Sequence, residues 1–241
     1  MCIQHGEGDS MPVLDKIPFE IDTSSLFERT RIEPTGEYSD EIRELAAQAA
    51  VVARPKAVYA AEFVSARYEE SITVGTVTFQ SRVLGSNLGG VERVFPYVVT
   101  CGVELDEIPV PEDDHLLLFC REIIKEMALS AGVLFLRAHL TQTYAVQKVT
   151  SMSPGSGDRD VWPIEQQKEL FHLLGDVRAD TGVVLTDNCL MIPNKSVSGI
   201  IYPAEIDFAT CRLCHREKCP SRKAEFDAAM WEEHGLAARR T

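Results

Sequence analysis

Three cysteines near the end of the chain have the spacing of a metal-binding segment. Cys211, Cys214 and Cys219 lie in the run CRLCHREKCP, where a Cys-x-x-Cys pair is followed five residues later by a third thiol. Such a pair can grip one metal from a single turn, and the third thiolate can close around it. The chain has seven cysteines, and an odd number in a reducing compartment favours a local metal site over disulfides.

The residues leave the kind of metal centre open. An iron–sulfur cluster is favoured, and the Cys-Pro ending is typical of ferredoxin-type ligand runs. Zinc is the alternative, although it normally takes a fourth protein ligand, for which His215 is awkwardly placed. Cys189 is the candidate for a distant fourth thiolate of a cluster. The interpretation without metal is three reduced cysteines in a loop.

A second stretch with chemical potential is a Gly/Pro loop followed by a helix. The loop consists of Ser153, Pro154, Gly155, Ser156 and Gly157. Glycines let backbone N–H and C=O groups approach a ligand without side-chain obstruction. Pro163 suits the first turn of a helix that is amphipathic up to Gly175.

The same stretch ends in the pattern Met-x-Pro-x-x-Ser-Val-Ser-Gly at residues 191–199. We expect Ser196, Ser198 and Gly199 to form a turn near the Gly/Pro loop. The purely structural alternative is a tight turn that only holds the sheet together. Either way, a last strand follows at residues 200–202.

The preceding elements must position these residues. Helical spacing predicts a helix from Ser39 that ends before Pro55. Residues 57–64, 72–79 and 91–101 are rich in Val, Thr, Tyr and Phe and predict strands. Residues 112–144 predict two packed helices or one long helix broken near 130–132. We further expect an irregular arm over residues 1–38 with a short strand near 18–21, core positions for Cys101 and Cys120, and a surface helix beyond Pro220.

Taken in order, these motifs resemble a known family. Ser153-Pro154-Gly155, a helix ending in Leu173-Leu174, Thr-Gly-Val-x-Leu-Thr at 181–186 and the pattern at 191–199 are similar to the reactivation domain of cobalamin-dependent methionine synthase. The stand-alone proteins of anaerobes that resemble this domain are more similar still. The match covers about 50 residues. The family loop usually carries a Tyr after Pro-Gly and an Arg before it; here Ser156 and Lys148 stand nearest to those positions.

The resemblance implies a single α+β domain, C-shaped, with a twisted, largely antiparallel sheet and packed helices. It places S-adenosylmethionine in a shallow groove near Lys148, residues 153–157 and the Ser196, Ser198 and Gly199 turn. We assign this domain to residues 1–205 and a cysteine-rich metal-binding extension with a terminal helix to residues 206–241.

The function that this resemblance implies is reactivation of a corrinoid. The protein would bind S-adenosylmethionine and support reductive methylation of cob(II)alamin on a corrinoid protein or cobalamin-dependent methyltransferase. The chain has no Asp-x-His-x-x-Gly signature, so the corrinoid is expected on a partner. Electrons would come from its own iron–sulfur cluster or from a donor such as ferredoxin or flavodoxin. The alternatives are a noncatalytic, metal-stabilised docking module for a corrinoid protein and a cluster-only corrinoid reductase.

Charge and hydropathy exclude other classes. The 37 acidic against 24 basic residues give a formal net charge of −13, which opposes attraction to nucleic acid and to anionic lipid. No run approaches the roughly 20 apolar residues of a membrane helix, and the first residues have no basic flank before an apolar core. We therefore expect a cytoplasmic protein with no nucleic-acid or membrane partner.

Overall fold

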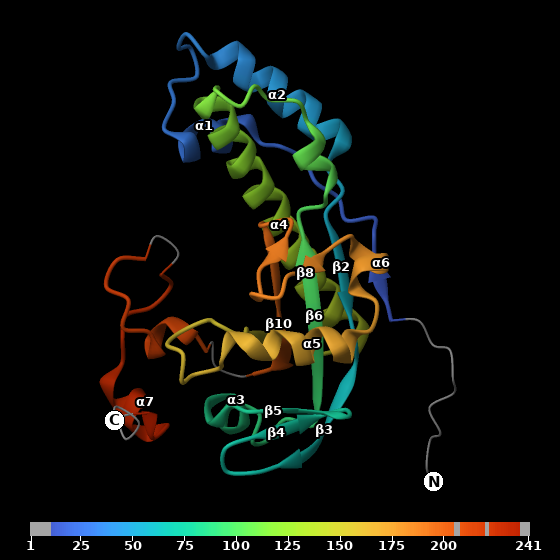
Figure 1. Cartoon of the computed structure of the whole chain (residues 1–241), viewed down its shortest axis with the longest axis vertical. Coiled ribbons are helices and arrows are strands. Elements are labelled where there is room, and N and C mark those ends of the chain that lie inside the picture. Colours follow the sequence, from blue (N-terminus) through green and yellow to red (C-terminus); the bar gives the residue numbers. More distant parts are fainter. Residues whose placement is uncertain (1–10, 205–207, 220–221, 237–241) are drawn as a thin grey trace.

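The structure is a computed structural model that describes residues 11–204, 208–219 and 222–236. It is an α+β fold built on one long antiparallel sheet, as the sequence predicts (Figure 1). Three helices gather at one end of the molecule, and a small β-hairpin and the C-terminal segment lie toward the other. Among the described residues, no helix combines the length and apolar character needed to cross a membrane.

Strand β6 (Arg93–Thr100) organises the sheet. Its Val and aromatic residues suit a strand covered on both faces, and every residue after Arg93 is buried. It pairs with β2 (Lys56–Tyr59), β3 (Glu62–Arg67) and β10 (Ser196–Pro203). Every pairing in the described part of the chain is antiparallel. The other strands are β1 (Val13–Leu14), β4 (Ile72–Val74), β5 (Val77–Phe79), β7 (Val149–Met152) and the separate pair β8 (Val184–Leu185) and β9 (Met191–Ile192).

The long helix α4 (His115–Tyr144) is continuous through residues 130–132, so the expected break is absent from this described element. Gly132 lies where the helix meets the sheet, and a Cβ there would come within 2.7 Å of Val99 Cγ1. The glycine at this position therefore lets α4 pack closely on β6, and it does not end the helix. The N-terminal half of α4 packs against α1 (Thr23–Thr30) and α2 (Ser39–Val52), and α2 ends before Pro55 as predicted.

The remaining helices are short. They are α3 (Arg82–Asn87), α5 (Gln167–Leu174), α6 (Val177–Thr181), α7 (Ala228–Glu233) and the 3-10 turns η1 (Glu104–Glu107), η2 (Ile164–Gln166) and η3 (Thr210–Leu213). Helix α5 crosses the sheet in Figure 1 and buries its apolar side, including Leu170 and Leu174, against it. This packing fixes the segment that follows the Gly/Pro loop.

A helix lies beyond Pro220 as predicted, but it does not lie on the surface. The described helix α7 spans six residues and begins where the Asp227 side chain caps it. Trp231 and Leu236 are buried in the same core as the sheet, and Leu213 of η3 joins them. Apolar burial of these side chains, rather than helix length, holds the C-terminal segment in place.

Three further predictions for local structure were wrong. The single strand predicted at 72–79 is a hairpin in which β4 pairs with β5. Residues 18–21 form no strand, and helix α1 follows instead, capped by the side chain of Asp22. The predicted strand at 57–64 is divided into β2 and β3 by Ala60 and Ala61, where the chain passes from one pairing with β6 to the next. Of the predicted arm, residues 1–10 lie outside the described residues.

Candidate functional site

A groove of about 450 Å³ lies between the Gly/Pro loop, the start of α5 and the segment that enters β10. We call it the 153–198 groove. All of its lining side chains are uncharged, and they mix apolar surface with hydroxyl and amide groups. They belong to Ser153, Pro154, Ile164, Gln167, Thr186, Cys189, Leu190, Met191, Ile192, Asn194, Ser196, Val197 and Ser198.

The first wall is the Gly/Pro loop, and Trp162 anchors it. Trp162 is fully buried, packs edge-on against Phe79 with ring centroids 5.6 Å apart, and accepts a 2.9 Å hydrogen bond from the Gly155 N–H through its carbonyl. Gly155 has φ of 76°, and a Cβ there would come within 2.9 Å of the Ile164 side chain. Glycine is therefore required for the loop to lie against a residue of the groove.

The second wall is the start of β10, where the predicted Ser-Val-Ser-Gly turn is in fact a strand. Ser196 and Ser198 are paired with β6 opposite Thr100 and Val98. Gly199 is buried, and a Cβ there would overlap the carbonyl oxygen of Met152. The glycine thus serves the close approach of β10 to β7, which explains it without a turn.

Hydroxyl and amide groups tie the second wall to α5 and to the segment that precedes β10. Gln167 Nε2 donates to Ser198 Oγ over 3.0 Å, and Ser196 Oγ donates to the Pro193 carbonyl over 2.8 Å. Cys189 is buried in the turn between β8 and β9 with φ of 59°, and its N–H donates to the Thr186 carbonyl. The loop and the 191–199 pattern, singled out from the sequence, therefore form one groove.

A buried lysine beneath the groove was missed by the sequence reasoning. Lys125 of α4 is 2% exposed, and its Nζ donates to Asp106 Oδ1, Glu122 Oε1 and Asn194 Oδ1 at 2.7, 2.9 and 2.7 Å. Burial opposes its charge, but the hydrogen bonds to the two carboxylates prevail and raise the pKa of the ammonium. The sequence feature that could have revealed this residue is a lysine on the apolar face of a predicted helix, next to Ile124.

The remaining residues predicted for ligand binding do not line the groove. Lys148 precedes β7 and lies at the end of that strand remote from Ser153. Ser156 donates through its N–H to the Ser153 carbonyl and closes the loop turn, and Gly157 lies beside Thr210 of η3.

The cysteine segment does not present a metal centre. Within the described ranges, no three His, Cys, Asp or Glu side chains are gathered closely enough to hold a metal ion. Cys211, Cys214 and Cys219 are partly exposed near η3, whereas Cys189 is buried in the groove wall. The donor set as arranged fits neither an iron–sulfur cluster nor zinc, because the four predicted thiols are not brought together.

Other contacts hold this segment. Arg222 donates to the carbonyls of Cys211 and Cys214, and the Lys223 N–H donates to Cys211 Sγ over 3.4 Å. The ring of His215 lies 4.2 Å from that of Phe226, centroid to centroid.

The cysteine segment also contacts Asp158, the residue that follows the Gly/Pro loop. Asp158 Oδ2 lies 2.5 Å from His215 Nδ1, and Asp158 Oδ1 accepts the His215 N–H over 3.1 Å. The Asp158 N–H donates in turn to the Leu213 carbonyl over 3.3 Å. The segment thus forms the outer support of the first wall of the groove.

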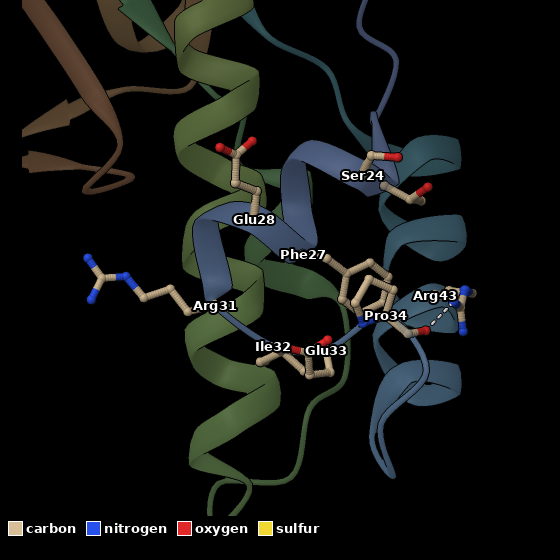
Figure 2. A pocket seen from close by; sticks show the side chains of 9 residues that line it. Ser24, Phe27, Glu28, Arg31, Ile32, Glu33, Pro34 and Arg43 are labelled. Carbon is tan, nitrogen blue, oxygen red and sulfur yellow. Dashed lines mark hydrogen bonds between the residues drawn. The ribbon is translucent and has the colours of Figure 1, made fainter.

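A second pocket, of about 550 Å³, lies beside α1 and the start of α2 (Figure 2). Its Arg43 lies over the Phe27 ring at 5.2 Å and donates to the Pro34 carbonyl at 2.5 Å, while Arg31 extends away from both. No sequence-predicted site residue lines this pocket. Arg43 holds the turn between the two helices, so the 153–198 groove is the better candidate site.

Comparison with known proteins supports the fold. A crystal structure of the MetH reactivation domain bound to AdoHcy aligns over 83% of this chain and 82% of that chain, with a TM-score of 0.54 and 17% sequence identity. No protein-family model and no curated protein matches the sequence. The chain therefore has the fold of a reactivation domain, as the motif resemblance predicts.

Proposed function

We propose that this chain binds S-adenosylmethionine in the 153–198 groove and supports reductive methylation of a corrinoid carried by a separate protein. One observation carries the proposal: the Gly/Pro loop and the 191–199 pattern form the two walls of one groove. The likeness to a reactivation domain crystallised with AdoHcy supports the choice of ligand.

The groove has the size and chemistry for an adenosyl ligand. Its volume falls within the roughly 300–1,000 Å³ of small-molecule sites. Ile164 and Met191 offer apolar surface to an adenine ring, while Asn194 and Ser153 offer polar groups to its edge and to a ribose. Because the lining is uncharged, the amino acid end of the ligand has no ionic partner in the groove. We expect weaker binding than an arginine-clamped site would give.

The reaction balances with one electron and one methyl group. Cob(II)alamin on the partner gains an electron and takes the methyl group from the sulfonium sulfur, giving methylcobalamin and S-adenosylhomocysteine. The corrinoid is a substrate here, and this chain contributes the position and orientation of the methyl donor. Because the described residues include no group of three side chains placed to hold a metal ion, the proposal assigns the electron to a separate donor such as ferredoxin or flavodoxin.

Titration calorimetry with S-adenosylmethionine and S-adenosylhomocysteine tests the proposal. We expect saturable binding of both to the wild-type chain and its loss in Gly155→Ala, where the new Cβ displaces the loop from Ile164. Gly90→Ala is the matched control, because a Cβ there meets nothing within 4 Å. Absence of binding to a folded wild-type chain contradicts the proposal.

The uncharged lining favours one rival, a noncatalytic docking module for a corrinoid protein. This rival predicts no heat from either adenosyl compound and retained binding of a corrinoid protein. The same calorimetry therefore separates the two. A cluster-only reductase has no supporting site in the part of the chain that the structure describes.

A further inference from the structure

We infer that Cys211 and Cys214 form a redox-active dithiol, which closes to a disulfide by exchange with a low-molecular-weight disulfide such as oxidised glutathione. The starting point is that the cysteine run, despite its ligand-like spacing, gathers no metal-binding group among the described residues. Neither thiol lines the 153–198 groove, so the inference does not rest on the proposed function.

The backbone between the two cysteines is a closed turn. Cys211 lies in η3, Cys214 ends that element, and the Cys214 N–H donates to the Cys211 carbonyl over 3.3 Å. Residues three apart in a 3-10 turn lie on the same face, and a turn closed by this bond keeps its end Cα atoms within about 7 Å. A disulfide needs Cα atoms about 4.4–6.8 Å apart. The turn therefore meets the backbone requirement of a disulfide.

Contacts from other segments hold this turn in shape. The Arg222 guanidinium donates to the carbonyls of Cys211 and Cys214 over 3.2 and 3.3 Å, so one side chain joins both ends of the turn. Between the two cysteines, Leu213 is fully buried, and its carbonyl accepts the Asp158 N–H over 3.3 Å. Because the turn is already fixed, the disulfide can close without unfolding the segment.

Both sulfurs are accessible to a small reactant. Cys211 and Cys214 are partly exposed, in contrast to the buried Cys101. Cys211 Sγ accepts the Lys223 N–H over 3.4 Å, and a backbone donor of this kind also binds the thiolate form that attacks a disulfide. We therefore assign the attack to Cys211 and the closing step to Cys214.

Electrons and protons balance over two exchanges. The Cys211 thiolate attacks one sulfur of the small disulfide, which forms a mixed disulfide and releases one thiolate that takes up the proton lost by Cys211. The Cys214 thiolate then attacks the Cys211 sulfur and releases the second small thiol in the same way. The two protein thiols lose two electrons and two protons, and the small disulfide gains them.

Incubation of the reduced, full-length chain with oxidised glutathione, followed by acid quenching, alkylation and peptide mass spectrometry, tests the inference. Trypsin cleavage after Arg212, Arg216 and Lys218 places the three cysteines of the run in separate peptides, so each possible pairing is identified directly. We expect the wild-type chain to lose two hydrogens and to yield the Cys211–Cys214 disulfide. Its unfolding midpoint in urea should not fall on oxidation.

Three variants separate the roles of the thiols. Cys219→Ser is the matched control and must form the same disulfide as the wild type, because Cys219 lies outside the turn. Cys214→Ser must stop at a mixed disulfide on Cys211, since no second thiol is there to close the turn. Cys211→Ser must react with glutathione more slowly than Cys214→Ser, because it lacks the attacking thiol.

Several outcomes overturn the inference. They are a disulfide that links Cys219 to either of the other two, glutathione that stays on the wild-type chain without closure, and a fall in the unfolding midpoint on oxidation. Metal analysis of protein purified under reducing, oxygen-free conditions adds a further test. Bound iron or zinc that is released in Cys211→Ser would make the thiols metal ligands and would also overturn the inference. None of these outcomes bears on the binding of S-adenosylmethionine.

Discussion

Gln167 Nε2 of α5 donates a 3.0 Å hydrogen bond to Ser198 Oγ of β10, and both residues line the 153–198 groove. Gln167 is 4% exposed and Ser198 is 3% exposed, so water cannot readily replace either partner. The contact joins the first residue of α5 to a strand paired on both sides by the sheet. The stability of the groove therefore depends on a neutral polar pair.

Ser198→Ala should lower the free energy of unfolding by about 1–3 kcal/mol, because it leaves a buried amide N–H without its partner. Urea denaturation measures the change. Adding Gln167→Leu to the same chain should cost less than the sum of the single changes, since no polar group is then orphaned. Ser86→Ala on the exposed side of α3 is the control and should change stability by less than about 0.5 kcal/mol. Strict additivity of the two buried changes would show that the contact contributes nothing.

Gly199→Ala should destabilise the protein by about 1–3 kcal/mol or more, because the added methyl group forces β10 away from the Met152 carbonyl. Gly90→Ala is a matched change at a turn where a Cβ meets nothing within 4 Å, and it should be neutral or slightly stabilising. Urea midpoints of the two variants make the comparison. Equal midpoints would mean that the two strands can separate at no cost.

Lys125→Met should cost about 1–3 kcal/mol, because it removes a buried ammonium that is hydrogen-bonded to the Asp106 and Glu122 carboxylates. The control is Arg159→Met, which removes an ion pair with Glu165 at 3.5 Å between side chains that are 84% and 59% exposed. Its loss should cost no more than about 1 kcal/mol. Thermal and urea unfolding of the two variants check the difference, and similar losses would argue against the importance of burial at Lys125.

The thiol of Cys101 should resist alkylation in the folded protein. Burial raises its pKa to about 12, so roughly one molecule in ten thousand carries the thiolate at pH 8. The partly exposed Cys211 and Cys214 should react first with iodoacetamide, as mass spectrometry of the digested protein can show. Labelling of Cys101 at the same rate would contradict its assignment to the core.

The raised pKa also gives the direction of a pH effect. The folded state holds the Cys101 proton above pH 9, where the unfolded thiol has lost it, so its contribution to stability declines between about pH 9 and 12. Cys101→Ala should flatten this decline in urea titrations at pH 8 and pH 10. A parallel decline in the variant would assign the effect to other groups.

The sequence carried enough information to bring the groove together. The loop at 153–157 and the pattern at 191–199 contain Gly and Pro. The backbone conformations that these residues favour depend on the local sequence and can therefore be predicted from it. The strand at Ser196 was mistaken for a turn because Ser and Gly favour turns on their own, whereas the pairing of residues 196–199 with β6 overrides that preference.

Contacts between residues far apart in the chain could not be predicted from the sequence. Lys125 meets Asn194 across 69 positions, and nothing in the local pattern of either residue specifies the other. The cysteine run shows the opposite case, because despite its ligand-like spacing no three metal-ligating side chains come together among the described residues. Spacing defines which donors are available, and packing decides whether they converge.

The burial of Leu213, Trp231 and Leu236 in the core of the sheet bears on how such a chain could be shortened or recombined. A protein ending near residue 205 would expose the apolar surface that these side chains cover and would remove the partner of Asp158, the residue after the Gly/Pro loop. The described residues of this C-terminal segment therefore belong to the same folding unit as the sheet.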